Sequence, residues 1–135
     1  MTLDLIHDLS RMDLPATFAA IRQEHWGTDL SEDDLRRAFL RSACLAAFDG
    51  ATQVGFARAV SDGITSAYLK DVVVFKGHRG RGIGRALVEG LFNHPDLQEV
   101  RAWTLGTRDA GRFYAGLGFR PVPGGIFMTL TRKRP

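Results

Sequence analysis

The sequence has little cysteine and no long apolar run. Its single cysteine, Cys44, cannot form a disulfide within the chain, which is typical of proteins in a reducing compartment such as the cytoplasm. No apolar run approaches the roughly 20 residues of a membrane-spanning helix. The first residues, MTLDLIHDLSRMD, lack the basic start and long apolar stretch of a secretory signal. We therefore expect a cytoplasmic protein that does not act at a membrane.

Two kinds of site are also disfavoured. Cys44 lies in the apolar run LRSACLAAF, which favours a small buried residue over a nucleophile. The histidines and acids show no spacing typical of metal ligands, so we expect no metal. The chain has no repeat, linker or low-complexity segment, and its 135 residues suit one domain spanning residues 1–135.

Hydrophobic periodicity and turn residues predict an α/β protein of the α+β type. Asp13 and Ser31 are expected N-caps, and Asp49-Gly50 is a hairpin signal. The expected order is β-α-α-β-β-β-α-β-α-β-β, a mixed, mostly antiparallel sheet flanked by helices. Strands are expected over residues 3–9, 45–48, 54–60, 66–75, 100–105, 119–122 and 126–131, and helices over 13–26, from 31 onward, over 82–93 and over 107–117.

The stretch of residues 68–89, YLKDVVVFKGHRGRGIGRALVE, joins an apolar strand, a basic glycine-rich loop and the start of a helix. Four cations, Lys76, Arg79, Arg81 and Arg85, stand there without an intervening acid, although the net charge of the chain is only +3. Glycines let the backbone approach a ligand, and the free amides of a helix N-terminus attract anions. The stretch predicts a pyrophosphate cradle, with a solvated basic turn as the simpler alternative.

Two familiar phosphate loops do not fit this stretch. A dinucleotide loop needs G-x-G-x-x-G near the start of a βαβ unit, whereas the glycines here are G-x-G-x-G and come late in the chain. A Walker loop needs Lys-Ser or Lys-Thr after its last glycine, and neither follows Gly84. The loop alone therefore indicates an anion without identifying it.

Two motifs together resemble the GNAT superfamily of N-acetyltransferases. Arg79-x-x-Gly82-x-Gly84, between a strand and a helix, is similar to the acetyl-CoA motif of that family. Residues 113–119, FYAGLGF, resemble its closing signature, in which a tyrosine precedes a Gly-Phe pair, and residues 107–110, TRDA, resemble a bacterial subgroup. The expected element order also matches the GNAT fold. The resemblance implies an acetyl-CoA-dependent N-acetyltransferase that works by direct attack in a ternary complex.

The resemblance also implies which residues hold acetyl-CoA. Backbone groups of Val72 and Val74 would bond the pantetheine arm, and the Val72 amide would polarise the acetyl carbonyl. Arg79 and Arg81 would add positive charge, unless they are ordinary surface cations. Thr107 stands where many relatives have Asn, and either bonds the pantetheine or, as is commoner, caps the following helix. The amides around the pyrophosphate would be those of Arg81, Gly82, Ile83, Gly84 and Arg85.

The resemblance makes Tyr114 the candidate general acid. A phenol with an ordinary pKa of about 10 keeps its proton at neutral pH and can give it to a departing thiolate. A tyrosine that merely packs is the alternative. We expect the catalytic residues to include Tyr114.

The general base is open, because Lys70 occupies a position where relatives often have an acid. A buried hydrogen-bond acceptor is an equally weighted role for Asp71. Loss of the amine proton through water, and an amine that arrives already neutral, are further alternatives. Strand alternation puts Asp71 on the opposite face from Lys70 and Val72, so the two faces cannot both line the cleft. The candidates are Asp71, Asp62, Glu24 and His25.

The acceptor is expected to be a small primary amine. His25 and Trp26 fall where GNAT enzymes form the lip that receives the acceptor, although a packing or surface histidine is the commoner case. A protein lysine or N-terminus is the alternative acceptor, and a non-catalytic acyl-CoA-binding module is a third hypothesis. A nucleic-acid partner is not expected, since the basic run is short. The protein is expected to be a monomer or a homodimer.

Overall fold

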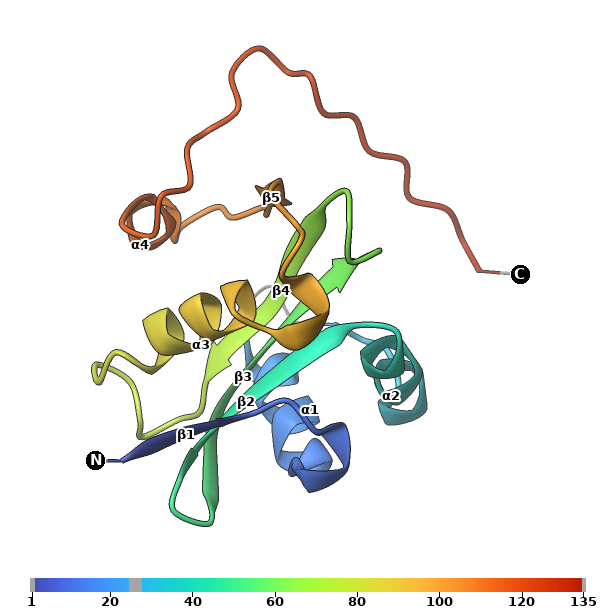
Figure 1. Cartoon of the computed structure of the whole chain (residues 1–135). Helices are drawn as coiled ribbons and strands as arrows, with labels where there is room; N and C mark the ends of the chain where they lie inside the picture. Colours follow the sequence, from blue (N-terminus) through green and yellow to red (C-terminus); the bar gives the residue numbers. More distant parts are fainter. Residues whose placement is uncertain (1, 25–27, 135) are drawn as a thin grey trace.

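A five-stranded sheet forms the centre of the computed structural model, which describes residues 2–24 and 28–134 (Figure 1). Neighbouring strands are antiparallel except for the last pair, β4 and β5, which is parallel. The sheet and its flanking helices confirm the α+β class. In spatial order the strands are β1 (Leu3–Ile6), β2 (Ala43–Asp49), β3 (Thr52–Ser61), β4 (Ala67–Val74) and β5 (Trp103–Thr104).

Helices cover both faces of the sheet (Figure 1). They are α1 (Leu14–Gln23) and α2 (Glu32–Leu40) on one face, α3 (Ile83–Phe92) on the other, the short α4 (Gly111–Ala115), and the 3₁₀ turns η1 (Leu9–Arg11) and η2 (Pro95–Leu97). The expected caps are present: Asp13 accepts from the Ala16 amide at 3.1 Å, and Ser31 forms a capping box with Asp34. Within the described residues, no helix is long and apolar enough to cross a membrane.

Each face of the sheet has its own apolar core. On one face Leu87, Val88 and Leu91 of α3 are fully buried against β2, β3 and β4. On the other, Phe39 of α2 stacks on Phe56 of β3 with ring centroids 4.7 Å apart. Cys44 belongs to this second core, where burial raises the pKa of its thiol to about 12. It is therefore the small buried residue that its apolar surroundings predicted.

The C-terminal third differs most from the prediction. The strand expected over residues 100–105 is only Trp103–Thr104, and the helix expected over 107–117 is only Gly111–Ala115. Residues 119–134 contain no strand, so the prediction of a terminal strand pair over 119–122 and 126–131 is wrong for this structure. Strand-forming sequence needs a partner strand to pair with, and the described chain places none beside β5.

The first turn of α3 lies unusually close to the sheet, because Gly55 of β3 has no side chain. A Cβ at Gly55 would come within 3.0 Å of the Leu87 side chain and 3.1 Å of both the Ile83 side chain and the Val73 carbonyl oxygen. Ile83 is the first residue of α3. Gly55 therefore helps to set where the N-terminus of α3 stands.

We expect Gly55→Ala to lower the free energy of unfolding by about 1–3 kcal/mol, because the added methyl overpacks the contact between β3 and α3. Urea denaturation measures the change. Gly111→Ala is the matched control, since a Cβ there meets no atom within 4 Å. Equal stability of the two variants would show that Gly55 does not govern this contact.

Candidate active site

A bulge in β4 shapes one wall of the site. Phe56 of β3 pairs with Val73, but Arg58 pairs with Lys70, so one β3 residue lies opposite two of β4. Asp71, one of these two, has a φ of 54° and is the one described non-glycine residue with a positive φ. Such a bulge shifts all later side chains of the strand to the other face. Strict alternation is therefore wrong here, and both Lys70 and Asp71 line the same cavity.

A buried ion pair holds the bulge in place. The Asp71 carboxylate accepts from Arg58 Nε at 2.5 Å, and the two side chains are only 11% and 9% exposed. Arg58 Nη1 also donates to Ser42 Oγ at 2.9 Å, and its guanidinium lies 5.5 Å from the centre of the Phe39 ring. The pair thus ties β4 to β3 and to the end of α2. This engagement favours the hydrogen-bond-acceptor role of Asp71, and its role as a base stays a prediction.

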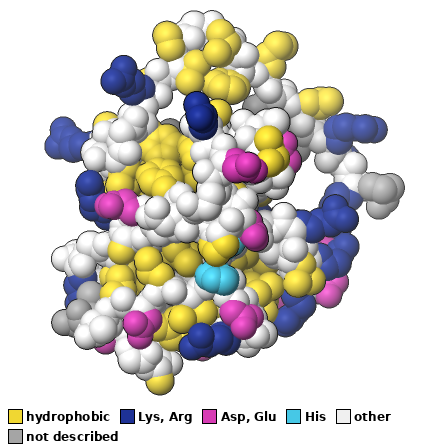
Figure 2. All heavy atoms as spheres, in the orientation of Figure 1, with side chains coloured by type: hydrophobic (Ala, Val, Ile, Leu, Met, Phe, Trp, Pro, Cys, Tyr) yellow, Lys and Arg dark blue, Asp and Glu magenta, His cyan; other side chains and the backbone are white. Residues whose placement is uncertain are grey.

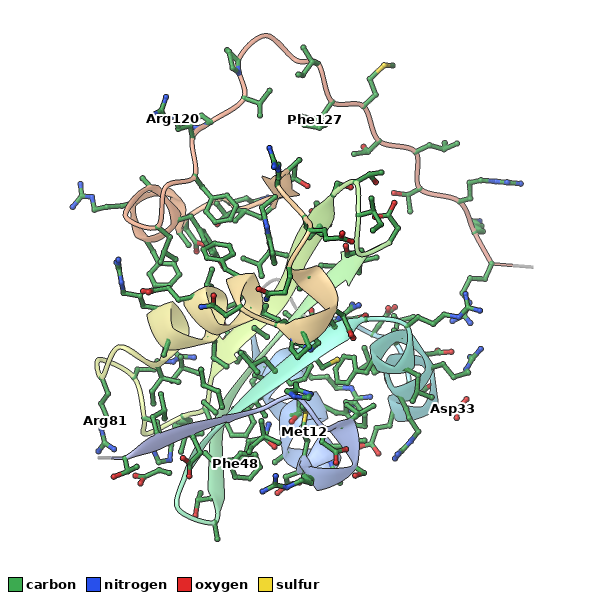
Figure 3. The ribbon with its side chains drawn as sticks, in the orientation of Figure 1. Met12, Asp33, Phe48, Arg81, Arg120 and Phe127 are labelled. Atoms are coloured by element: carbon green, nitrogen blue, oxygen red, sulfur yellow. The ribbon has the colours of Figure 1, made fainter. Side chains whose placement is uncertain are left out.

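A cavity of about 690 Å³ opens between β4, the loop from β4 to α3, and the segment from residue 106 into α4. Arg81 does not line it, and Figure 3 shows that side chain pointing outward from the loop. His25 and Trp26, the predicted acceptor lip, lie outside the described residues. The predicted site residues that do line the cavity are Asp71, Val72, Val74, Arg79, Gly82, Ile83, Gly84, Arg85, Thr107 and Tyr114.

The N-terminus of α3 presents unpaired amides to this cavity. Gly82 is the N-cap and adopts a left-handed φ of 77°, which a residue with a Cβ rarely takes. No side chain caps the helix, and its first hydrogen bond runs from the Ala86 amide to the Gly82 carbonyl at 3.1 Å. No described residue accepts from the amides of Ile83, Gly84 and Arg85. Free amides at a helix N-terminus favour an anion, so this geometry is compatible with the pyrophosphate cradle, which stays a prediction.

Tyr114 of α4 lines the same cavity. Its ring packs edge-on against Phe113 and Phe119, and burial raises the pKa of its phenol above the ordinary value. Phe113 also touches the helix of the anion site, since a Cβ at Gly84 would lie 3.4 Å from the tip of its ring. The packing of α4 on α3 thus places a protonated phenol and the free amides around one cavity.

The other candidate bases are also engaged. Glu24 accepts from Arg79 Nη2 at 2.8 Å. Asp62 does not line the cavity; hydrogen bonds from the side chain and backbone of Thr65 and from the Ile64 amide hold its pKa at about 2. Asp62 is therefore a turn-forming residue, and no described carboxylate among the candidates is free of a donor.

The two remaining polar residues of the prediction have local partners. Thr107 Oγ1 accepts from the Ala110 amide at 3.0 Å and so stabilises the turn before α4. The N-cap of α4 is Ala110 and no described side chain caps this helix, so the expectation that Thr107 caps it is wrong, and its bond to pantetheine stays a prediction. Arg85 Nε pairs with Glu89 at 2.6 Å, and both side chains are half exposed. Neither interaction removes the side chain from the cavity wall.

Several lining residues were not predicted. Arg58 is the one cation within the apolar run VGFARAV, which is a signal that it has a buried partner. That partner, Asp71, is 13 positions away and could not be assigned from the sequence. Arg108 follows β5 and had only its charge as a signal. Tyr68 and Phe113 belong to predicted motifs, yet nothing in their spacing gave them a position in the site.

The comparisons with known proteins define the class. Residues 41–121, more than half of the chain, match the acetyltransferase (GNAT) domain family. The chain therefore belongs to the GNAT acetyltransferase family. A crystal structure from Xanthomonas campestris pv. campestris, assigned to the same family, is 36% identical, with a TM-score of 0.88 over 97% of this chain and 94% of that one.

Curated relatives match over a smaller share of their own length. A histone acetyltransferase of Glycine max is 38% identical over 74 residues, which cover 54% of this chain and 32% of the relative. A chloroplastic serotonin N-acetyltransferase of Oryza sativa subsp. japonica is 36% identical over 103 residues, which cover 70% of this chain and 50% of the relative. This chain thus spans half or less of the length of these relatives.

Removing one partner of the buried ion pair should strongly destabilise the fold. Arg58→Met leaves the Asp71 carboxylate buried without its cation, and we expect a loss of about 3–5 kcal/mol in urea denaturation. Adding Asp71→Asn should restore part of this loss, because the uncompensated charge disappears. The control is Arg37→Met, which removes an exposed arginine that pairs with Asp33 and Asp34 and should cost about 1 kcal/mol or less. Similar losses in both arginine variants would contradict this role.

Proposed function

We propose that the protein is an acetyl-CoA-dependent N-acetyltransferase acting on a small primary amine. The observation that carries the proposal is the single cavity that joins the free amides of α3 to the phenol of Tyr114. An anion site alone fits many ligands, whereas an anion site and a proton donor that line one cavity suit a thioester with a phosphorylated carrier. The buried thiol of Cys44 supports a reducing compartment, and we propose the cytoplasm.

The residues present fit acetyl-CoA, which GNAT acetyltransferases use. Its pyrophosphate suits the amides of Ile83, Gly84 and Arg85. Besides Arg58, which is paired with Asp71, four cations line the cavity and would balance its phosphates: Lys70, Arg79, Arg85 and Arg108. The volume of about 690 Å³ is within the range of small-molecule sites, roughly 300–1,000 Å³.

The chemistry requires three things of this chain. The acetyl carbonyl must be polarised, and the Val72 amide beside the bulge is the candidate donor. The attacking amine forms a C–N bond as the C–S bond breaks, and Tyr114 then donates its phenolic proton to the sulfur. The amine proton leaves through the open side of the cavity, by way of water or a carboxylate such as Asp71. The raised pKa of Tyr114 keeps the donor protonated at neutral pH.

The acceptor is the least constrained part of the proposal. The rice relative is named for serotonin, a small primary amine, and matches 70% of this chain, whereas the soybean relative is named for histones and matches 54%. We favour the small amine on this basis. A protein acceptor and a non-catalytic acyl-CoA-binding module are the alternatives that the assay must separate.

The first experiment is a free-thiol release assay with acetyl-CoA over a panel of small amines and a lysine-containing peptide. Turnover with a small amine supports the proposal, while turnover with the peptide alone favours a protein acceptor. Thermal shift with acetyl-CoA, CoA and heparin runs beside it. Stabilisation by acetyl-CoA without any turnover would indicate a binding module. Stabilisation by heparin alone would contradict a coenzyme A site.

Gly82→Ala should weaken acetyl-CoA binding by about tenfold or more, because a Cβ strains the left-handed residue that begins α3 and shifts its free amides. Isothermal titration calorimetry measures the dissociation constant. Gly77→Ala is the matched control: Gly77 also has a positive φ and open space around it, but it does not line the cavity. Equal weakening in both variants would place the anion elsewhere.

Tyr114→Phe should lower kcat by about 10²-fold or more, the usual contribution of a general acid, with little change in the dissociation constant of acetyl-CoA. The ring and its contacts with Phe113 and Phe119 remain, so the fold is expected to be unchanged. Steady-state kinetics at saturating substrates, with calorimetry as the binding control, measure both quantities. An unchanged kcat would remove Tyr114 from the mechanism.

A further inference from the structure

Two cations lie opposite each other in one wall of the cavity. Arg58 of β3 pairs in register with Lys70 of β4, and both line the cavity; we call them the cation pair. Like charges directly opposite each other destabilise an antiparallel sheet, because their Cβ atoms are only roughly 4.5–5.5 Å apart. Asp71 compensates Arg58, but among the described residues no acid pairs with Lys70. The sheet thus holds a cation at a position where a bound anion would stabilise it.

Several exposed cations of the chain have an acid beside them, and Lys70 differs from them in this respect. Figure 2 shows acidic side chains next to several Lys and Arg side chains on the face that it draws. Arg37 pairs with Asp33, for example, and Arg85 with Glu89. A cation without an acid in a cavity wall is instead available to a ligand.

Arg58 also has a donor to spare. A guanidinium carries five N–H groups on three nitrogens. Nε donates to Asp71 and Nη1 donates to Ser42, whereas no described residue accepts from Nη2. Because Arg58 is only 7% exposed, packing and these two bonds fix where its guanidinium lies. A fixed nitrogen with free N–H groups and a neighbouring ammonium are together the donors that a carboxylate or a phosphate requires.

The cation pair lies away from the amides that suit the pyrophosphate. The end of β4 is near that site, since a Cβ at Gly84 would lie 3.7 Å from Val74 Cγ2. Lys70 comes four residues earlier, roughly 10–13 Å back along the strand. It adds to the positive potential around the phosphates, but Arg79 and Arg85 are the lining cations next to the N-terminus of α3. Lys70 is therefore available to a different group.

The cation pair lies instead where an acceptor would enter. The register of β4 with β5 ends at Tyr68 and Thr104, and beyond this point residues from 70–74 and from 106–110 line the cavity. The Val72 amide, the candidate donor to the acetyl carbonyl, belongs to the first of these segments. An amine that attacks at this amide has the cation pair beside it.

We propose that the acceptor carries an anionic group, a carboxylate or a phosphate, in addition to its primary amine, and that the cation pair binds this group. The inference rests on the function proposed above and narrows the class of its acceptor. Asp71 compensates one charge of the pair, so a singly charged group compensates the other. Asp109, the second lining carboxylate, already has a partner, and Arg108 keeps the surroundings of the amine positive.

Matched acceptors test the charge directly. Glycine is compared with glycinamide, and phosphoethanolamine with ethanolamine, in the thiol-release assay at saturating acetyl-CoA. We expect kcat/KM to be about tenfold or more higher for the anionic member of one pair, because ionised groups form the stronger hydrogen bonds. The pair that shows the difference identifies a carboxylate or a phosphate. A negative charge also raises the pKa of the nearby amine, which favours the neutral analogue and so cannot produce the expected result.

Lys70→Gln should lower the ratio of the two kcat/KM values by about tenfold or more, because it removes the charge and keeps a polar side chain. The ratio cancels any effect of the variant on acetyl-CoA or on proton loss, which both acceptors share. Lys70→Glu should reverse the preference. Arg101→Gln is the matched control, since Arg101 is exposed and does not line the cavity. Arg58 is not varied, because its loss should destabilise the fold.

Calorimetry in the presence of CoA measures acceptor binding without turnover and so separates this inference from the proposed function. Tighter binding of the anionic acceptor that Lys70→Gln abolishes, without any turnover, would support the subsite and contradict the acetyltransferase. Turnover with equal kcat/KM within both pairs would overturn the subsite and leave the acetyltransferase standing. A preference that persists in Lys70→Gln, one that Arg101→Gln removes equally, or anionic acceptors that bind no better than the neutral ones would also overturn it.

Discussion

The buried ion pair between Arg58 and Asp71 is the interaction on which the site depends. It lies where β3 and β4 lose register, and it compensates a backbone conformation that costs roughly 1–3 kcal/mol in a residue other than glycine. The bulge brings Val72 and Val74 to the α3 side of the sheet and leaves Val73 on the other. Because Arg58 also contacts Ser42 and Phe39, the bulge is fixed from three elements at once.

The remaining walls of the cavity follow from two contacts of α3. Gly55 lets the first turn of α3 settle on β3, and the Phe113 ring of α4 lies beside Gly84 of α3. The first contact sets the position of the free amides, and the second sets the position of Tyr114 relative to them. The anion site and the proton donor therefore share one cavity, although they come from segments about 30 residues apart in the sequence.

Local sequence signals predicted the parts of the structure that local interactions determine. The caps at Asp13 and Ser31, the hairpin at Asp49-Gly50, and the strand, glycine loop and helix that hold the anion site were all expected, and all are present. The bulge was not predictable from the local sequence, because DVVV is typical of an uninterrupted strand. The bulge depends on the ion pair of Asp71 with Arg58, which lies on the neighbouring strand β3. The prediction of the terminal strands failed for the opposite reason. Their sequence favours a strand, but the described chain supplies no partner strand for them.

The cations of the cavity bear on how the proposed amine acceptor would lose its proton. Each described carboxylate proposed as a base accepts from a donor: Asp71 from Arg58, Glu24 from Arg79, and Asp62 from the turn at Thr65. Lys70 lies next to the bulge and lines the cavity, where relatives often have an acid. A positive charge near a bound ammonium lowers its pKa and so favours the neutral amine that attacks. On this hypothesis Lys70 does not replace the missing base but lessens the need for one, and the proton still leaves by way of water or a carboxylate such as Asp71.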